Sequence, residues 1–66
     1  MKLSNENIKT TLQLANTLLE LADKGDLERE DIGCGILYGI MRDAAYKIKK
    51  VAESEKALHE KMGNWF

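Results

Sequence analysis

The sequence predicts an all-α protein, an antiparallel helical hairpin with a short first helix and a long second helix. Apolar residues recur at helical spacing on both sides of one short acidic stretch. The chain of 66 residues contains no proline that would interrupt either run. This length corresponds to one small domain, so we expect a single helical-hairpin domain over residues 1–66.

The first helix is expected over about residues 5–24. Ser4 or Asn5 can serve as its N-cap, and Lys24 followed by Gly25 is typical of a helix C-terminus. Its apolar residues form two adjoining rows, which predicts contact with two neighbouring helices. The rows contain Ile8, Leu12, Ala15, Leu19 and Ala22, with Leu14, Leu18 and Leu21 beside them.

The connection is expected over 25–31 and is strongly acidic. Asp26 could cap a short helical turn over 27–30, and Asp31 could cap the long helix. The second helix therefore begins near either residue 27 or residue 32. The spacing of the acidic residues does not match a calcium-binding EF-hand loop, so the cluster indicates a solvated helix start.

The second helix is expected over about 32–62, and it carries a heptad repeat typical of a helix–helix seam. Glu55 is the one polar residue of this seam, and it either fixes the register or lies at a solvated end. Gly63 is expected to end the helix before a tail over 63–66. Trp65 either folds back onto the last turn or docks on another subunit. The seam contains Leu37, Met41, Ala44, Ile48, Val51, Glu55, Leu58 and Met62, extended backward through Cys34.

The first third of the second helix, residues 32–41, is apolar on every side and includes three glycines. Gly35 and Gly39 lie one turn apart on one face, which predicts a close approach of another helix. The alternative is a kinked helix start weakened by glycine.

These features predict a homodimeric four-helix bundle. A chain of this size buries only about 60% of its unfolded surface. The single Cys34 excludes an intramolecular disulfide. A first helix over about residues 5–24 would also leave residues 52–62 of the second helix uncovered. The layout resembles the Rop-like helical hairpin dimers, although no sequence motif of that family is present and no site is carried over. The expected dimer interface contains Ile32, Gly35, Ile36, Gly39, Ile40, Leu58 and Met62.

No catalytic, metal or cofactor site is expected. Glu55 and His59 lie four residues apart, whereas di-iron bundles use Glu-x-x-His. Cys34 is expected to be a buried and inert thiol, the alternative being a redox or intermolecular disulfide role. We therefore predict a protein without enzyme activity that acts through protein–protein contacts, as an adaptor, regulator or accessory subunit. A further hypothesis is a groove for an unidentified protein, formed by 32–41 and the tail.

Nucleic-acid binding is the alternative function. Basic residues repeat every seven positions and are expected on the outward face of the second helix, where they could contact phosphates. Glu53 and Glu60 alternate with them, which favours local salt pairing and would repel a phosphate backbone. The possible nucleic-acid contacts are Arg42, Tyr46, Lys49, Lys50 and Lys56.

No membrane association is expected, because no apolar run approaches the roughly 20 residues needed to cross a bilayer. The first nine residues also lack the apolar core and the cleavage site of a signal peptide. We therefore expect a cytoplasmic location.

Overall fold

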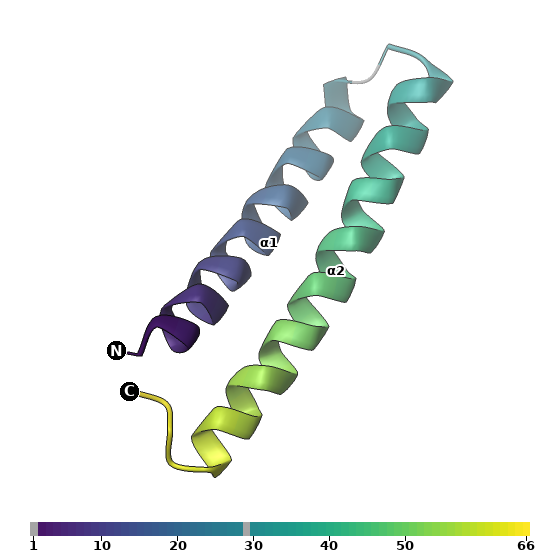
Figure 1. The fold of residues 1–66 in the computed structure, drawn as a ribbon. Helices are drawn as coiled ribbons and strands as arrows, with labels where there is room; N and C mark the ends of the chain where they lie inside the picture. Colours follow the sequence, from purple (N-terminus) through teal and green to yellow (C-terminus); the bar gives the residue numbers. More distant parts are fainter. Residues whose placement is uncertain (1, 29) are drawn as a thin grey trace.

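The computed structural model describes residues 2–28 and 30–66 and contains two helices packed against each other (Figure 1). Helix α1 runs over Leu3–Glu28 and helix α2 over Ile32–Lys61. They lie antiparallel and side by side, and the two ends of the chain lie together at the end away from the turn. The molecule measures 48 × 16 × 13 Å, so it is one helix thick and two helices wide. The predicted all-α hairpin is confirmed.

The predicted end of the first helix is wrong. Gly25 does not adopt the positive φ of a helix stop; it lies inside α1, where the ring of Tyr38 packs directly against it. The helix therefore continues to Glu28, and the next residue, Asp26, pairs with Arg42 of α2 instead of capping a turn. Residue 29 of the predicted turn over 27–30 lies outside the described residues.

The predicted start of the first helix is also wrong, since α1 begins at Leu3 and both Ser4 and Asn5 lie within it. With 26 residues, α1 spans nearly the whole length of the 30-residue α2. Asn5 reaches His59 near the far end of α2. Residues 52–62 are therefore not an overhang, contrary to the expectation from a first helix of about 20 residues.

Both ends of α2 are close to their predicted positions. Asp31 is the N-cap, and its Oδ1 accepts a hydrogen bond of 2.7 Å from Cys34 N. This bond, which requires the ionised carboxylate as acceptor, lowers the pKa of Asp31. At the other end Met62 is the C-cap, and Gly63 follows with φ 74°. The predicted glycine stop is confirmed.

The contact between the helices is made by small residues. Ala15 and Ala22 of α1 and Ala45 and Ala52 of α2 are buried, each pair seven residues apart. Small side chains let two helices approach closely. The seam predicted for α2 is therefore displaced by one residue: Ala44 is exposed, whereas its neighbour Ala45 is fully buried.

Candidate functional site

One broad side of the hairpin carries a long apolar surface. A shallow groove of about 440 Å³ opens there between the helices, lined on α1 by Asn7, Ile8 and Thr11. Ile48 and Val51 line it on α2, with Lys47 and Glu55 beside them. The groove shows which side of each helix this surface includes.

The same side continues along both helices, because residues three and four apart lie above one another on a helix. From Thr11 the row on α1 continues through three leucines. From Ile48 and Val51 the row on α2 continues in both directions. We call this surface the apolar face, and its apolar members are Ile8, Leu14, Leu18, Leu21, Leu37, Met41, Ile48, Val51 and Leu58.

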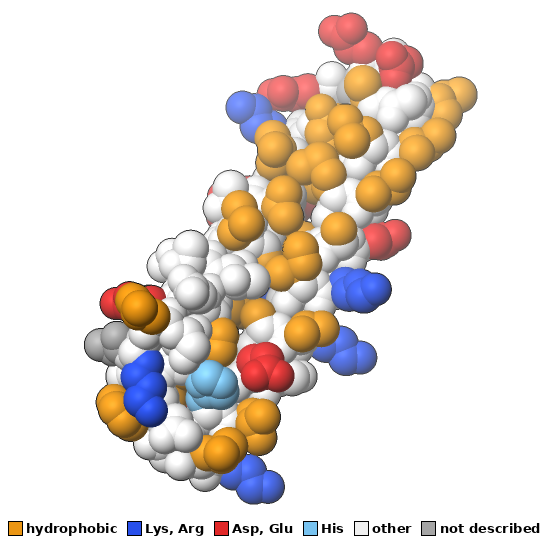
Figure 2. Space-filling view, viewed as in Figure 1, with side chains coloured by type: hydrophobic (Ala, Val, Ile, Leu, Met, Phe, Trp, Pro, Cys, Tyr) orange, Lys and Arg blue, Asp and Glu red, His pale blue; other side chains and the backbone are white. Residues whose placement is uncertain are grey.

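Most of these side chains remain open to solvent in the single chain. Val51 is 58% exposed, Leu14 56%, Leu37 51% and Leu21 50%. Figure 2 shows hydrophobic side chains gathered over both helices, most densely toward the turn. Scattered apolar residues are normal on protein surfaces, but a contiguous apolar surface across two elements is typical of an interaction site.

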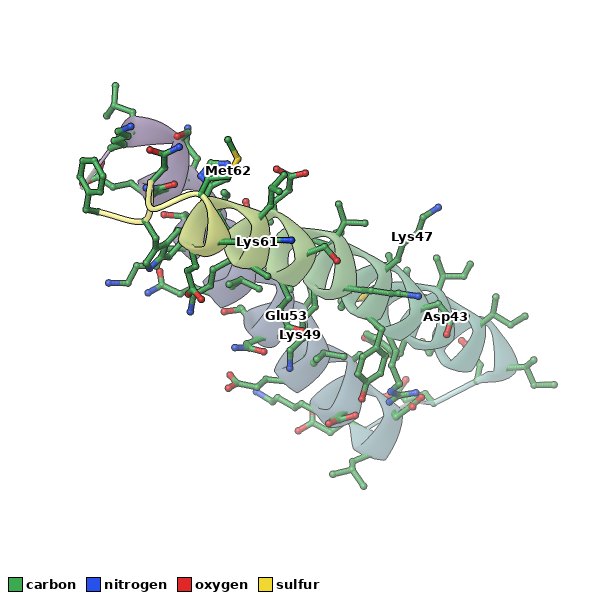
Figure 3. The ribbon with its side chains drawn as sticks, turned by 90° about the horizontal axis from the view of Figure 1, so that it is seen from below. Asp43, Lys47, Lys49, Glu53, Lys61 and Met62 are labelled. Atoms are coloured by element: carbon green, nitrogen blue, oxygen red, sulfur yellow. The ribbon has the colours of Figure 1, made fainter. Side chains whose placement is uncertain are left out.

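The opposite broad side, the polar face, is different in character. In Figure 3 Lys49 and Glu53 project from the edge of α2 that borders the polar face. Lys47 and Met62 project from the edge that borders the apolar face. On the polar face a second groove is lined by Lys9, Asn16, Lys56 and Trp65, together with Leu12 and Gln13. The hairpin therefore has one apolar and one polar side.

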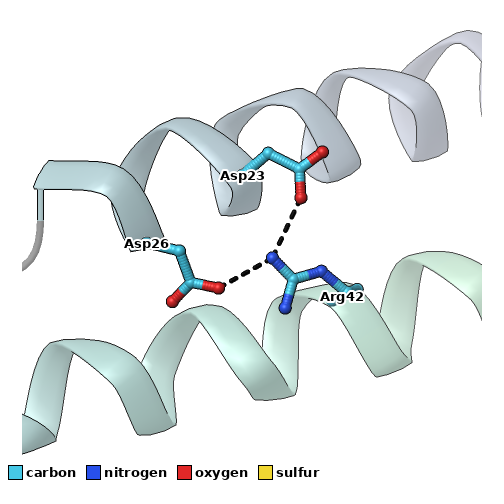
Figure 4. Close-up of polar contacts among 3 residues, drawn as sticks. All are labelled: Asp23, Asp26 and Arg42. Atoms are coloured by element: carbon cyan, nitrogen blue, oxygen red, sulfur yellow. Dashed lines mark hydrogen bonds and ion pairs between the residues drawn. The ribbon is translucent and has the colours of Figure 1, made fainter.

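Arg42 joins the two helices on the polar face. Its guanidinium Nη2 donates to Asp26 Oδ2 at 2.8 Å and to Asp23 Oδ1 at 2.9 Å (Figure 4). These hydrogen bonds, the one to Asp26 first, raise the pKa of Arg42 further above its ordinary value. One cation balanced by two carboxylates is a cross-link between helices rather than a free phosphate contact.

Three of the basic residues that were predicted to be exposed on the outward face of α2 lie partly buried instead. Arg42, Lys49 and Lys56 are all half-buried. The ammonium group of Lys56 lies 5.3 Å from the centre of the Trp65 ring and 3.8 Å from Glu60. Trp65 itself is half-buried beside α1 and α2, which agrees with the prediction that it folds back onto the helix. Tyr46 and Lys50, in contrast, are exposed.

A polar cluster ties the two ends of the chain together, and the sequence reasoning missed it. Asn5 is fully buried, and its Nδ2 donates to the backbone carbonyls of Asn64 (2.5 Å) and Phe66 (3.2 Å). Its Oδ1 is left to accept, so His59 Nδ1, 2.5 Å away, carries a proton and donates to it. Only the antiparallel register brings these residues together, and a sequence pattern carries no signal of that contact.

The structure places the predicted interface residues on several parts of α2. Leu58 belongs to the apolar face, and Met62 follows on the same row of α2. Ile32, Gly35 and Ile36 instead line a separate shallow surface beside Glu30 and Asp31. Gly39 is half-buried, and a Cβ added there would meet no atom within 4 Å. Within one chain the close approach occurs at Gly25. Ile40 is 62% exposed.

Cys34 lies at the start of α2, and Glu55 and His59 lie near its end. Cys34 is half-buried in the first turn of α2. His59 Nε2 lies 3.8 Å from Glu55 Oε2, a spacing that permits an ion pair only when the imidazole is protonated. Over residues 2–28 and 30–66 no group of three or more His, Cys, Asp or Glu is placed to hold a metal ion.

Comparison with known proteins gives no relative from which a function could be transferred. No protein-family model, no curated protein and no solved structure matches the chain. In the part of the chain that the structure describes, neither helix is sufficiently long and apolar to cross a membrane.

Proposed function

We propose that this chain is a small protein without catalytic activity that works as a homodimer, through protein–protein contacts, as an adaptor, regulator or accessory subunit. The observation that carries the proposal is the apolar face, which extends over both helices while the single chain buries mainly alanines. A second hairpin laid on this face would complete a four-helix bundle.

A second copy is the occupant that the dimensions favour. A standard interface takes roughly 800 Å² from each partner. The chain exposes 4986 Å² in total, so an interface of that size would use about a sixth of its surface. The broad side of a rod 48 Å long and 16 Å wide is nearly that large. A two-fold dimer uses the same patch twice, which a single long face on each chain provides.

The experiment compares two glutamate substitutions on α2. Val51 lies on the apolar face and is 58% exposed, and Tyr46 is 57% exposed without belonging to it. Val51→Glu buries a charge at the interface of both subunits, so we expect the dimer Kd to rise by about 100-fold or more. Tyr46→Glu is the matched control and should leave the Kd within about threefold of wild type.

Sedimentation velocity between 1 and 100 µM measures both variants, and circular dichroism follows their helix content. Equal dimerisation of the two variants would contradict the proposal, because the apolar face would then not be the contact. A wild-type chain that remains a folded monomer throughout would also contradict it.

The structure offers less to nucleic-acid binding. Arg42 is neutralised by two aspartates, and Lys56 contacts Glu60 and Trp65. Binding of random RNA and DNA at low ionic strength is the direct test, since phosphate contacts strengthen as salt falls. We expect no retention.

A further inference from the structure

We propose that the second copy lies with its turn at the same end as the turn of the first, so that α2 of each chain packs on α1 of its partner. This inference rests on the proposed function, and it adds the orientation of the dimer. The distribution of polar residues along the apolar face favours this orientation.

The apolar face has two unlike halves. Near the turn both helices contribute apolar side chains, Leu18 and Leu21 from α1 and Leu37 and Met41 from α2. Near the chain ends α2 still contributes Val51 and Leu58, with Met62 following on the same row. There α1 contributes Asn7 and Thr11 on either side of Ile8, and the one carboxylate of the face, Glu55, lines the same groove.

The register of the hairpin places these residues at defined levels. Gly25 contacts Tyr38 at one end, and Asn5 contacts His59 at the other. Glu55 therefore lies level with the polar part of α1, and Met41 lies level with the leucines. Asn7, Thr11 and Glu55 therefore occupy one end of the rod, whereas Lys47 lies near its middle.

Two hairpins can stack on this face about a two-fold axis in two ways. With both turns at one end, α2 lies over the partner's α1, so the fully apolar halves meet each other. Glu55 then meets the half that carries Asn7 and Thr11 of the other copy, where the amide N–H groups of Asn7 can donate to the carboxylate.

With the turns at opposite ends, α2 lies over the α2 of the other copy and α1 over its α1. Each Glu55 would then be placed near Leu37 and Ala44 of the other copy, and Leu21 would lie against Asn7. A carboxylate enclosed by apolar side chains, with only His59 of its own helix 3.8 Å away, is costly. This arrangement would bury two of them.

Surface charge favours the opposite orientation but weakly. Glu28, Glu30 and Asp31 at the turn are exposed, and turns at the same end bring two such acidic groups together. Exposed charges at the rim of an interface are screened by water and salt, so their repulsion is small beside the burial of Glu55. The polarity of the face therefore decides the orientation.

Distances between spin labels on the two chains test the orientation. In a Cys34→Ser background, Glu30→Cys places a nitroxide at the turn and Lys61→Cys places one near the chain ends. Both positions are exposed. Asp43→Cys, on the outer side of α2 and close to the middle of the helix, is the control (Figure 3). It lies near the centre of the rod, so its distance depends little on the orientation.

The proposed orientation predicts short distances at both ends, on the order of 20–30 Å, because the labels are separated only by the width of the bundle. Turns at opposite ends would separate them by nearly the 48 Å length of the rod. Long distances from both end labels would overturn the orientation and leave the homodimer intact. Absence of any distance from all three labels, with a monomer in sedimentation, would overturn the proposed function as well.

Discussion

The inner seam and the apolar face of this hairpin use opposite kinds of residue. Between α1 and α2 the buried apolar side chains are alanines, Ala15 and Ala22 of α1 and Ala45 and Ala52 of α2. Most of the leucines, isoleucines and valine of the apolar face remain open to solvent. An alanine methyl group contributes about 0.8 kcal/mol when buried, whereas a fully buried leucine contributes about 1.5–3 kcal/mol. Most of the hydrophobic driving force of this chain is therefore available only on the outside.

This difference is the basis for the proposal that the two-helix rod is a subunit of a dimer. Small residues bring the helices together, and Arg42, Asn5 and Asp31 fix their register and ends by polar contacts. We expect the second copy to contribute the rest of the folding stability. Substitutions at each of these contacts separate their contributions to stability.

The largest effect is expected from Ala45→Leu. A leucine in the fully closed alanine seam forces the helices apart, and we expect the free energy of unfolding to fall by about 3 kcal/mol. Ala57→Leu is the matched control, since Ala57 of α2 is exposed and does not belong to the apolar face. Urea unfolding followed by circular dichroism measures both variants. If they lose equal stability, the inner seam is not where the structure places it.

Asn5→Leu should be the next most damaging change. The substitution leaves the carbonyls of Asn64 and Phe66 and the N–H of His59 without their buried partner. We expect a loss of about 2 kcal/mol in the free energy of unfolding. Asn16→Leu, an exposed site on the same helix, is the control and should be nearly neutral. Equal effects of the two would show that the buried cluster contributes nothing particular.

A smaller and salt-dependent effect is expected from Arg42→Met, which removes the charge but keeps the stem. We expect the Tm to fall by a few degrees at low ionic strength, and this difference should shrink at high salt. Asp26→Asn should cost more than Asp23→Asn, because the Asp26 side chain is 30% exposed and that of Asp23 71%. A reversed order, or no response to salt, would contradict the bridge drawn in Figure 4.

The smallest effect concerns the N-cap of α2. Asp31→Ala should lower the Tm slightly, whereas Asp31→Asn should retain the cap, because asparagine accepts the same hydrogen bond. The fold lowers the pKa of Asp31, so its extra stabilisation is present above the ordinary value of 3.8 and is lost as the pH falls through the folded value. The stability of wild type should therefore fall more steeply in acid than that of the Asp31→Asn variant. Parallel pH profiles would contradict the cap.

The hairpin and the ends of α2 could be predicted from sequence because their signals are local. An aspartate N-cap at residue 31 and a glycine at residue 63 act within a few residues of themselves. The stop expected at Gly25 is equally local but wrong. Tyr38, thirteen residues away along the chain, packs against this glycine and keeps it helical.

The candidate site could be predicted only in part. The heptad row through Ile48 and Val51 was found by its large apolar residues, and these form the open face. Of the closed seam, Ala15 and Ala22 belong to the row predicted for the first helix, whereas Ala45 and Ala52 were missed because alanine is a weak signal in a hydrophobic pattern. Asn5 and Arg42 were misplaced for a different reason. Their environments come from the other helix, and only the register of the hairpin determines them.

The most direct test of the central claim is the mass of the wild-type chain in solution. Sedimentation equilibrium over 1–100 µM should give a folded species of about twice the 7.5 kDa chain mass, with dissociation only toward the dilute end. A helical, cooperatively folded species that remains at 7.5 kDa over the whole range would contradict the claim that a second copy covers the apolar face.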